Sequence, residues 1–243
     1  VAVLSSHFRP VSHYFRQNFS QVTNPPIDSL RENKVMSLKT RFGNLGNILD
    51  FDNLTEENIY VLDSPILTNS QFRKFKRFFS KKIKVIDCTF DIQNSLKDRI
   101  EAIREEAETA VREGSTCIVL SDKDFSSEKA SIPSILTVGA VHSHLVKHGL
   151  RGYCSLNVEC SDAMDTHSFA ILIGVGATTV NPYLAIDSIY QRFEKKLFGK
   201  SDFESCVIKF KKSIDSGLLK IMSKMGISVI SSYRGGCNFE AVG

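Results

Sequence analysis

The sequence predicts an α/β fold in which a mainly parallel sheet is flanked by helices, arranged as an open sheet or an incomplete barrel. From residue 81 onward, apolar strand-like runs alternate with amphipathic helical stretches, the order typical of strand–helix–strand units. The run CIVL at residues 117–120 is apolar throughout, as in strands with both faces covered by helices. We expect one domain over residues 1–243, with an irregular N-terminal arm (1–80) and a regular α/β core (81–243).

The arm begins with apolar residues at helical spacing, which predict a helix over residues 11–21. Pro25 and Pro26 must interrupt it, because proline lacks the amide hydrogen of a helix and restricts the preceding residue. A second short helix is expected over 29–38. Residues 43–63 are rich in glycine, asparagine and aspartate and predict a loop.

A basic stretch follows. Residues 71–84 contain seven Lys or Arg and no acidic residue, whereas the rest of the chain has 24 basic and 27 acidic residues. Bases mixed with aromatic rings occur in single-stranded nucleic-acid binders. However, Phe72, Phe75 and Phe79 follow the i, i+3, i+7 spacing of one buried helix face with a solvated basic back. We favour the helix and expect no nucleic-acid partner.

The regular core predicts alternating elements. In order they are a strand at 83–86, a helix at 96–111, a strand at 116–120, a helix at 133–148, a strand at 153–158, a strand–helix pair within 169–190, a helix at 203–225 and a strand at 227–230. Ser95 is expected to cap the first of these helices and Gly114 to end it. Gly226 is expected to end the last.

Gly174 and Gly176 stand in a GVG sequence that resembles part of a phosphate-binding loop. The dinucleotide fingerprint requires a third glycine three residues later, where this chain has Thr179. The sequence therefore favours a tight turn between a helix and a strand.

Three histidines, His142, His144 and His148, fall on one predicted helix. The last two are four residues apart, a spacing that can place two ligands on one metal ion. No glutamate directly follows His144, and no third ligand is evident from the sequence. We therefore expect a solvent-facing helix edge and no metal site.

The six cysteines include no Cys-x-x-Cys pair, which excludes zinc ribbons and thioredoxin-type motifs. We expect a reduced, cytoplasmic protein without disulfides. No run approaches the roughly 18 apolar residues of a membrane span, and the N-terminal residues do not resemble a secretory signal. No nucleophile elbow, Walker loop or paired-carboxylate motif is present. The residue patterns alone thus predict an α/β domain but do not identify its activity. We expect no catalytic residue in this domain.

Several long motifs narrow the assignment. They are YFRQNFSQVTNPPID (14–28), VMSL (35–38), LDSPILTN (62–69), VGAVH (138–142), HSFAILIGVG (167–176), VNPYLA (180–185), GLLKIMSKMGI (217–227), SSYRG (231–235) and FEAVG (239–243). Together, in this order, they resemble the central domain of the large (alpha) subunit of glutamate synthase, bacterial type. Many members of that family have Ala-Gln-Ile where this chain has Gly236, Cys237 and Asn238. This variant is more similar to the pyridine-nucleotide-linked branch, so the resemblance implies an NADPH-linked enzyme.

The resemblance implies a connecting role within a longer polypeptide. In the family, an N-terminal amidotransferase domain hydrolyses glutamine, and ammonia travels through a tunnel to an FMN domain that forms glutamate from 2-oxoglutarate. The implied partners are these two domains and the small subunit. FMN and an iron–sulfur cluster would be bound in adjoining parts. The family's cluster uses Cys-x5-Cys-x4-Cys; Cys154 and Cys160 match the first spacing, but Asp165 occupies the third position, so we interpret the match as coincidence.

The resemblance also suggests site residues. Thr23 and Asn24, followed by rigid prolines, are candidates for lining the ammonia tunnel; the alternative is that the prolines only turn the chain. Met36 and Ser37 are candidates for a position near the flavin and 2-oxoglutarate site, although Met36 is equally plausible as a core residue. The isolated chain is expected to fold without activity. The alternative functions are a self-contained flavin- or nucleotide-binding α/β oxidoreductase and a nucleic-acid binder.

Overall fold

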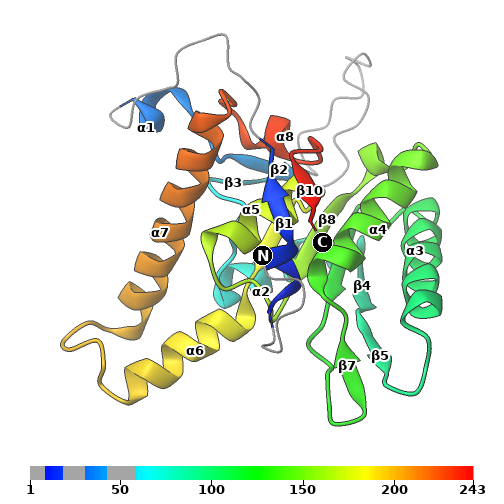
Figure 1. The fold of residues 1–243 in the computed structure, drawn as a ribbon, viewed down its shortest axis with the longest axis horizontal. Coiled ribbons are helices and arrows are strands. Elements are labelled where there is room, and N and C mark those ends of the chain that lie inside the picture. The colour runs from blue at the N-terminus through cyan, green and yellow to red at the C-terminus, as the bar shows by residue number, and fades with distance from the viewer. Residues whose placement is uncertain (1–8, 19–30, 43–58, 243) are drawn as a thin grey trace.

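The computed structural model describes residues 9–18, 31–42 and 59–242 (Figure 1). Its first half contains the 3-10 turn η1 (Val11–Tyr14), β1 (Phe15–Gln17), α1 (Glu32–Val35), β2 (Thr40–Phe42), β3 (Tyr60–Leu62), α2 (Asn69–Phe78), β4 (Ile83–Asp87), β5 (Thr89–Asp91), α3 (Leu96–Arg112) and β6 (Cys117–Ser121). Its second half contains β7 (Lys129–Ser131), α4 (Ser134–Lys147), the 3-10 turn η3 (Arg151–Tyr153), β8 (Ser155–Glu159), α5 (Thr166–Gly174), β9 (Thr179–Asn181), α6 (Tyr183–Glu194), α7 (Phe203–Lys224), α8 (Ile230–Tyr233) and β10 (Phe239–Ala241).

A four-stranded parallel sheet in the order β4-β6-β8-β9 forms the centre of the fold. Each strand pairs with the next one along the chain, beginning with Ile83 opposite Cys117. Helices α3, α4 and α5 connect these strands, and parallel neighbours need such crossovers. The predicted α/β class is therefore confirmed. Within the described residues the sheet is open, with β4 at one edge and β9 at the other, where Val180 of β9 forms a parallel bridge with Ile66.

The position of strand β6 in the fold explains why its sequence is almost entirely apolar. Every residue from Cys117 to Ser121 is buried. Ile118 and Leu120 belong to the main core with α3 and α4, whereas Cys117 and Val119 belong to a second cluster with α2. Successive side chains of a strand point to opposite faces, so both faces of this sheet are covered.

Helix α2 covers the second face with phenylalanine rings. Thr68 begins it with a capping box: its Oγ1 accepts a hydrogen bond from the amide of Gln71, and the Gln71 side chain accepts one from the amide of Thr68. Phe72, Phe75 and Phe79 are buried against the sheet. The prediction of an apolar helix face with a basic back is confirmed, and these three rings are not available to stack on nucleic-acid bases.

Helix α7 forms the outer layer over α5 and α6. Asp202 caps its N-terminus through a 2.8 Å hydrogen bond from the amide of Ser205. Gly217 lies against Thr166 of α5, so closely that a Cβ at this position would lie 2.5 Å from the threonine methyl group. Gly226 follows the helix with a φ of +68°, a conformation that favours glycine. The predicted helix and its stop are confirmed.

The predicted helix over residues 11–21 is wrong in its described part. Val11–Tyr14 is a single 3-10 turn, and Phe15–Gln17 is β1, which pairs antiparallel with β10 (Phe239–Ala241). The partner strand lies more than 220 residues away along the chain. Local periodicity therefore gives no sign of this pairing.

The other arm predictions need smaller corrections. The helix expected over 29–38 is only Glu32–Val35 in the described residues, and the loop expected over 43–63 contains β3, which pairs with β2. The strand expected over 227–230 is a single bridge between Ser37 and Val229 before α8 begins. Two backbone hydrogen bonds to Ser37 form this bridge: the Ser37 amide donates to the Ser228 carbonyl at 2.8 Å, and the Ile230 amide donates to the Ser37 carbonyl at 3.0 Å.

Most remaining elements of the core agree with prediction to within a few residues. The strand–helix pair expected within 169–190 begins later, as β9 and α6, because Phe169 lies in helix α5. Ser95 caps α3 by accepting a hydrogen bond from the amide of Asp98, and Gly114 follows that helix with a φ of +96°. The GVG sequence forms the expected turn between α5 and β9, where Gly176 has a φ of +124°. The antiparallel pair β5–β7 beyond the end of β4 was not predicted. No described helix combines the length and apolar character that crossing a bilayer requires.

Candidate functional site

The carboxyl ends of the four parallel strands gather polar side chains. Asp87 ends β4, Ser121 ends β6, Glu159 ends β8 and Asn181 ends β9. In open α/β sheets ligands bind at this edge, because the strands end there and the connecting loops can supply contacts. This edge is therefore the first candidate for a binding or catalytic site.

Glu159 is the centre of a buried ion-pair network at this edge. Its side chain is 7% exposed and accepts hydrogen bonds from Ser121 Oγ at 2.8 Å and from Lys76 Nζ at 3.2 Å. Lys123 Nζ lies 3.9 Å away on the other carboxylate oxygen. One lysine of the basic stretch thus neutralises a buried carboxylate, which ties α2 to the sheet.

Asp122 forms a second polar centre directly after β6. Its Oδ2 accepts hydrogen bonds from the Ser161 amide and from Ser131 Oγ, both at 3.0 Å, and from Ser161 Oγ at 2.5 Å. Burial and the neighbouring Asp122 carboxylate raise the pKa of the Tyr183 hydroxyl. These contacts hold the loops after β6 and β8 together.

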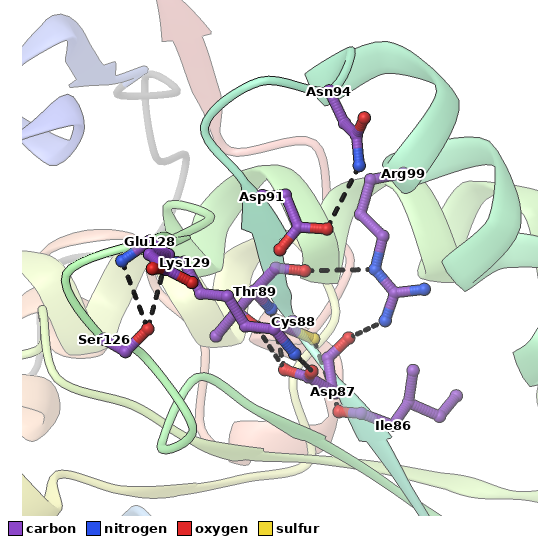
Figure 2. Close-up of polar contacts among 10 residues, drawn as sticks. All are labelled: Ile86, Asp87, Cys88, Thr89, Asp91, Asn94, Arg99, Ser126, Glu128 and Lys129. Atoms are coloured by element: carbon purple, nitrogen blue, oxygen red, sulfur yellow. Dashed lines mark hydrogen bonds and ion pairs between the residues drawn. The ribbon is translucent and has the colours of Figure 1, made fainter.

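A polar cavity of about 490 Å³ opens at the outer end of this edge, beside β5 and the start of α3. Figure 2 shows Arg99 extending from α3 between the residues that follow β4. Arg99 Nε donates to the Thr89 carbonyl at 3.1 Å, and Nη2 donates to the Asp87 carbonyl. Asp87 Oδ1 in turn accepts from the Thr89 amide at 2.9 Å and from its hydroxyl at 2.8 Å. Arg99 thereby fixes the turn between β4 and β5.

Charged side chains line that cavity. Asp91 accepts a 3.1 Å hydrogen bond from Asn94 Nδ2, and Lys129 Nζ lies 4.0 Å from Asp87 Oδ2 (Figure 2). The cavity is also lined by Asp98 and Arg99. Carboxylates and cations are thus interleaved, which suits a small polar ligand better than an apolar one.

Four buried cysteines, Cys88 and Cys160 at this edge and Cys117 and Cys154 at the opposite edge, are poor nucleophiles. Burial raises the pKa of the Cys88 thiol and of the Cys117 thiol to about 12 in each case. Burial also raises the pKa of Cys154 and of Cys160. Since the thiolate is the reactive form, these thiols are inert near neutral pH.

Cys154 and Cys160 lie on either side of β8, one immediately before the strand and one immediately after it. A strand rises about 3.3 Å per residue, so six steps separate the two by roughly 20 Å. They cannot bind one iron–sulfur cluster. The interpretation of their spacing as coincidence is confirmed.

The predicted solvent-facing edge of histidines is wrong for His144. Its side chain is 10% exposed and lies between α3 and α4, with Nε2 2.5 Å from Glu108 Oε2. Its ring contacts His148 at a centroid distance of 4.3 Å, whereas His142 points elsewhere, to Arg151. The ligand atoms of Glu108, His144 and His148 lie within 4.8 Å of one another, a grouping that could hold a metal ion.

Sequence reasoning missed Glu108 because it stands 36 residues from His144 on another helix. Glu108 also accepts a 2.8 Å hydrogen bond from Arg112 Nε, and Arg104 Nη2 lies 3.3 Å from His144 Nδ1. The Arg112 and His144 hydrogen bonds lower the pKa of Glu108. An ion-pair network between α3 and α4 accounts for all of these contacts.

The structure locates two of the four residues singled out from the sequence. Thr23 and Asn24 lie outside the described residues. Met36 is 7% exposed and belongs to the main core. Ser37 forms the bridge to Val229 through its backbone, and its Oγ accepts a hydrogen bond from the Lys39 amide at 3.1 Å. Met36 and Ser37 thus attach the arm to the segment between α7 and α8.

The comparisons with known proteins identify relatives over the whole chain. Residues 1–243 match the family described as glutamate synthase central domain. The chain is 55% identical to the glutamate synthase (NADPH) large chain of Azospirillum brasilense and 41% identical to that of Bacillus subtilis. In each case 100% of this chain aligns with 16% of the relative. The chain is also 40% identical to the chloroplastic ferredoxin-dependent glutamate synthase of Spinacia oleracea, again covering 16% of it.

Solved structures give a more distant likeness. The recombinant flavin-binding domain of baker's yeast flavocytochrome b2 aligns with a TM-score of 0.44 and 15% identity, over 72% of this chain and 38% of that one. A mutant flavocytochrome b2 with benzoylformate aligns with a TM-score of 0.44 and 13% identity, over 69% of this chain and 37% of that one.

Proposed function

Because this chain belongs to the glutamate synthase central-domain family, we propose that it is the connecting domain of a glutamate synthase large chain. In this proposal it is a single domain between a glutamine amidotransferase domain and an FMN-binding domain of the same polypeptide. The observation that carries the proposal is the match of the whole chain to a 16% segment of relatives at up to 55% identity.

The whole enzyme, as proposed, converts glutamine and 2-oxoglutarate into two molecules of glutamate at the expense of NADPH. The amidotransferase domain hydrolyses the amide of glutamine, and the released ammonia condenses with the keto group of 2-oxoglutarate. Reduced FMN, bound in the adjoining domain, supplies the hydride. The proposal assigns no catalytic residue to the present chain.

The pairing of β1 with β10 supports a connecting role. These strands are antiparallel, with Phe15 opposite Ala241, so the chain entering β1 and the chain leaving β10 lie at the same end of the pair. Neighbouring domains attached at these two points would start close together. That arrangement shortens the path between an amidotransferase site and a synthase site.

The proposed path is a tunnel for ammonia, and this domain forms part of its wall. Neutral ammonia must be kept from bulk water, where it becomes protonated and escapes. Thr23 and Asn24 are the proposed wall residues. Met36 and Ser37 are proposed, from the resemblance to the family, to lie near the flavin and 2-oxoglutarate site. Backbone hydrogen bonds fix Ser37 to Ser228 and Ile230.

The proposal includes an iron–sulfur cluster in an adjoining part of the large chain, a small subunit as partner and a cytoplasmic location. The proposal assigns neither the iron–sulfur cluster nor FMN to the residues of this chain.

The experiment compares the complete gene product with the 243-residue chain. Both are supplied with glutamine, 2-oxoglutarate and NADPH, and glutamate formation is measured. Activity is expected only in the complete gene product. Glutamate formed by the 243-residue chain alone would overturn the proposal, as would a complete gene product without glutaminase and synthase activity.

A further inference from the structure

A small cationic cavity lies at the amino-terminal end of the parallel sheet, opposite the edge described above. Its volume is about 260 Å³. The described residues that line it are Arg41, Phe42, His142, Arg151, Gly152, Cys154, Ser155, Thr178 and Arg234. Three of these nine are arginines and none is acidic. They come from six separate parts of the fold: β2, α4, η3, the start of β8, the residue before β9 and the residue after α8.

The side chain of Arg151 is held in a fixed position in the wall of this cavity. Its guanidinium donates to the carbonyls of Cys154 at 2.7 Å and Gly176 at 2.8 Å, and to Nδ1 of His142 at 3.1 Å. The acceptors of these hydrogen bonds are all groups of the protein itself. The charge of Arg151, however, is not neutralised by any carboxylate among the described residues, and burial lowers its pKa.

Arg234 is different, because one nitrogen of its guanidinium, Nε, is buried without a hydrogen-bond partner among the described residues. Burial and the charge of Arg151 lower the pKa of Arg234 to about 10. A covered donor without an acceptor is costly, since this N–H group has lost its hydrogen bond to water without gaining another. Such a group is expected where a ligand supplies the acceptor.

His142 completes the wall in a fixed orientation. Gly176 and Gly235 enclose its ring: a Cβ on Gly176 would lie 2.3 Å from it, and one on Gly235 would lie 2.9 Å from Nε2. Because Nδ1 accepts the hydrogen bond from Arg151, the proton of the neutral ring belongs on Nε2. The ring is therefore a further donor and carries no negative charge.

From this geometry we infer that the cavity bounded by Arg41, Arg151 and Arg234 binds a single oxyanion group, a phosphate or a carboxylate. Guanidinium groups match the planar, multi-oxygen geometry of these anions. A volume of about 260 Å³ admits one such group but is below the range of larger ligands. The anion is either a free small molecule or a carboxylate side chain from elsewhere in the same polypeptide. This inference is independent of the function proposed above.

The experiment titrates inorganic phosphate, and separately acetate, into the complete gene product by calorimetry at constant ionic strength. Saturable binding is expected, weakened tenfold or more by Arg234→Gln and weakened less by Arg234→Lys, which keeps a point charge. Arg41→Gln provides a second variant at an exposed residue of the rim, where the substitution leaves no buried group unpaired. Arg73→Gln, on the exposed face of α2, is the matched control and is expected to bind as the unaltered protein does.

A second arm distinguishes the two sources. If a carboxylate of the same polypeptide occupies the cavity, phosphate binds the 243-residue chain but not the complete gene product, and the Arg234→Gln form of the chain loses that binding. If the anion is a free molecule, both forms bind. Absence of binding in both forms, or binding that Arg234→Gln and Arg41→Gln leave unchanged while circular dichroism shows intact folding, overturns the inference.

Discussion

Arg151 and His142 are joined by a 3.1 Å hydrogen bond from the guanidinium Nε to the imidazole Nδ1. The histidine is thus held next to a permanent positive charge. Burial, followed by the charges of Arg151 and Arg234, lowers the pKa of His142 to about 4. The neutral ring is the form that the folded protein requires.

This relationship predicts an acid sensitivity. Below pH 6.5 the unfolded chain takes up a proton at His142 that the folded chain does not accept until about pH 4. The free energy of unfolding should therefore fall as the pH drops from 6.5 toward 4. His142→Asn should flatten this dependence in urea titrations, whereas His13→Asn, on an exposed turn, should keep it. An unchanged slope in His142→Asn would contradict the assignment.

The phenylalanine face of α2 predicts a large difference between two neighbouring rings. Phe75 is fully buried, whereas Phe78 is 50% exposed. Phe75→Ala should lower the free energy of unfolding by about 3 to 5 kcal/mol, because it leaves a cavity against the sheet. Phe78→Ala should lower it by about 1 kcal/mol or less. Urea denaturation measures both, and equal losses would show that α2 does not pack as described.

Arg99 is predicted to stabilise the turn between β4 and β5. Arg99→Met removes the donors to the carbonyls of Asp87 and Thr89 and should lower the free energy of unfolding by about 1 to 3 kcal/mol. Lys97→Met, two residues earlier on an exposed part of the same helix, is the control and should have little effect. Hydrogen exchange of the Thr89 amide should accelerate only in the Arg99 variant. Equal effects of the two substitutions would contradict the role of Arg99 in stabilising this turn.

The tunnel proposal predicts a loss of coupling in the complete gene product. Thr23→Val should raise the glutamine hydrolysed per glutamate formed, because an altered wall lets ammonia escape before it reaches the synthase site. Thr109→Val, an exposed position on α3, should leave the ratio at its original value. Measurement of both products in one reaction gives the ratio. An unaltered ratio in the Thr23 variant would count against the tunnel role.

The position proposed for Met36 predicts a kinetic effect. Met36→Ala should raise the KM for 2-oxoglutarate by roughly threefold to tenfold in the complete gene product. Leu38→Ala truncates an equally buried side chain two residues away and controls for loss of packing. Similar KM and kcat values in the Met36 variant and the unaltered enzyme would make Met36 a core residue only.

Local sequence patterns predicted the elements whose partners are close in the chain. The helix Leu96–Arg112 and the strand Cys117–Ser121 follow one another and pack together, so periodicity and capping residues were sufficient. The strand Phe15–Gln17 was missed because its partner lies at residues 239–241. The pattern of residues 227–230 predicts a strand, but among the described residues only Ser37 pairs with them.

The sites depend even more on distant residues. Glu108 reaches His144 from another helix, and Arg41, Arg151 and Arg234 meet from widely separated segments. Each arginine by itself is an ordinary surface-type residue in the sequence. Only the folded arrangement places their charges around one cavity without a carboxylate among the described residues.

The antiparallel register of β1 and β10 determines how the domain responds to force. A pull on the segments attached to Phe15 and Ala241 acts at one end of the strand pair, so its hydrogen bonds would open one after another. Such peeling resists tension far less than a shearing geometry, in which all bonds are loaded at once. Tension applied through these segments would therefore be absorbed at this short ribbon, while the central parallel sheet stays intact.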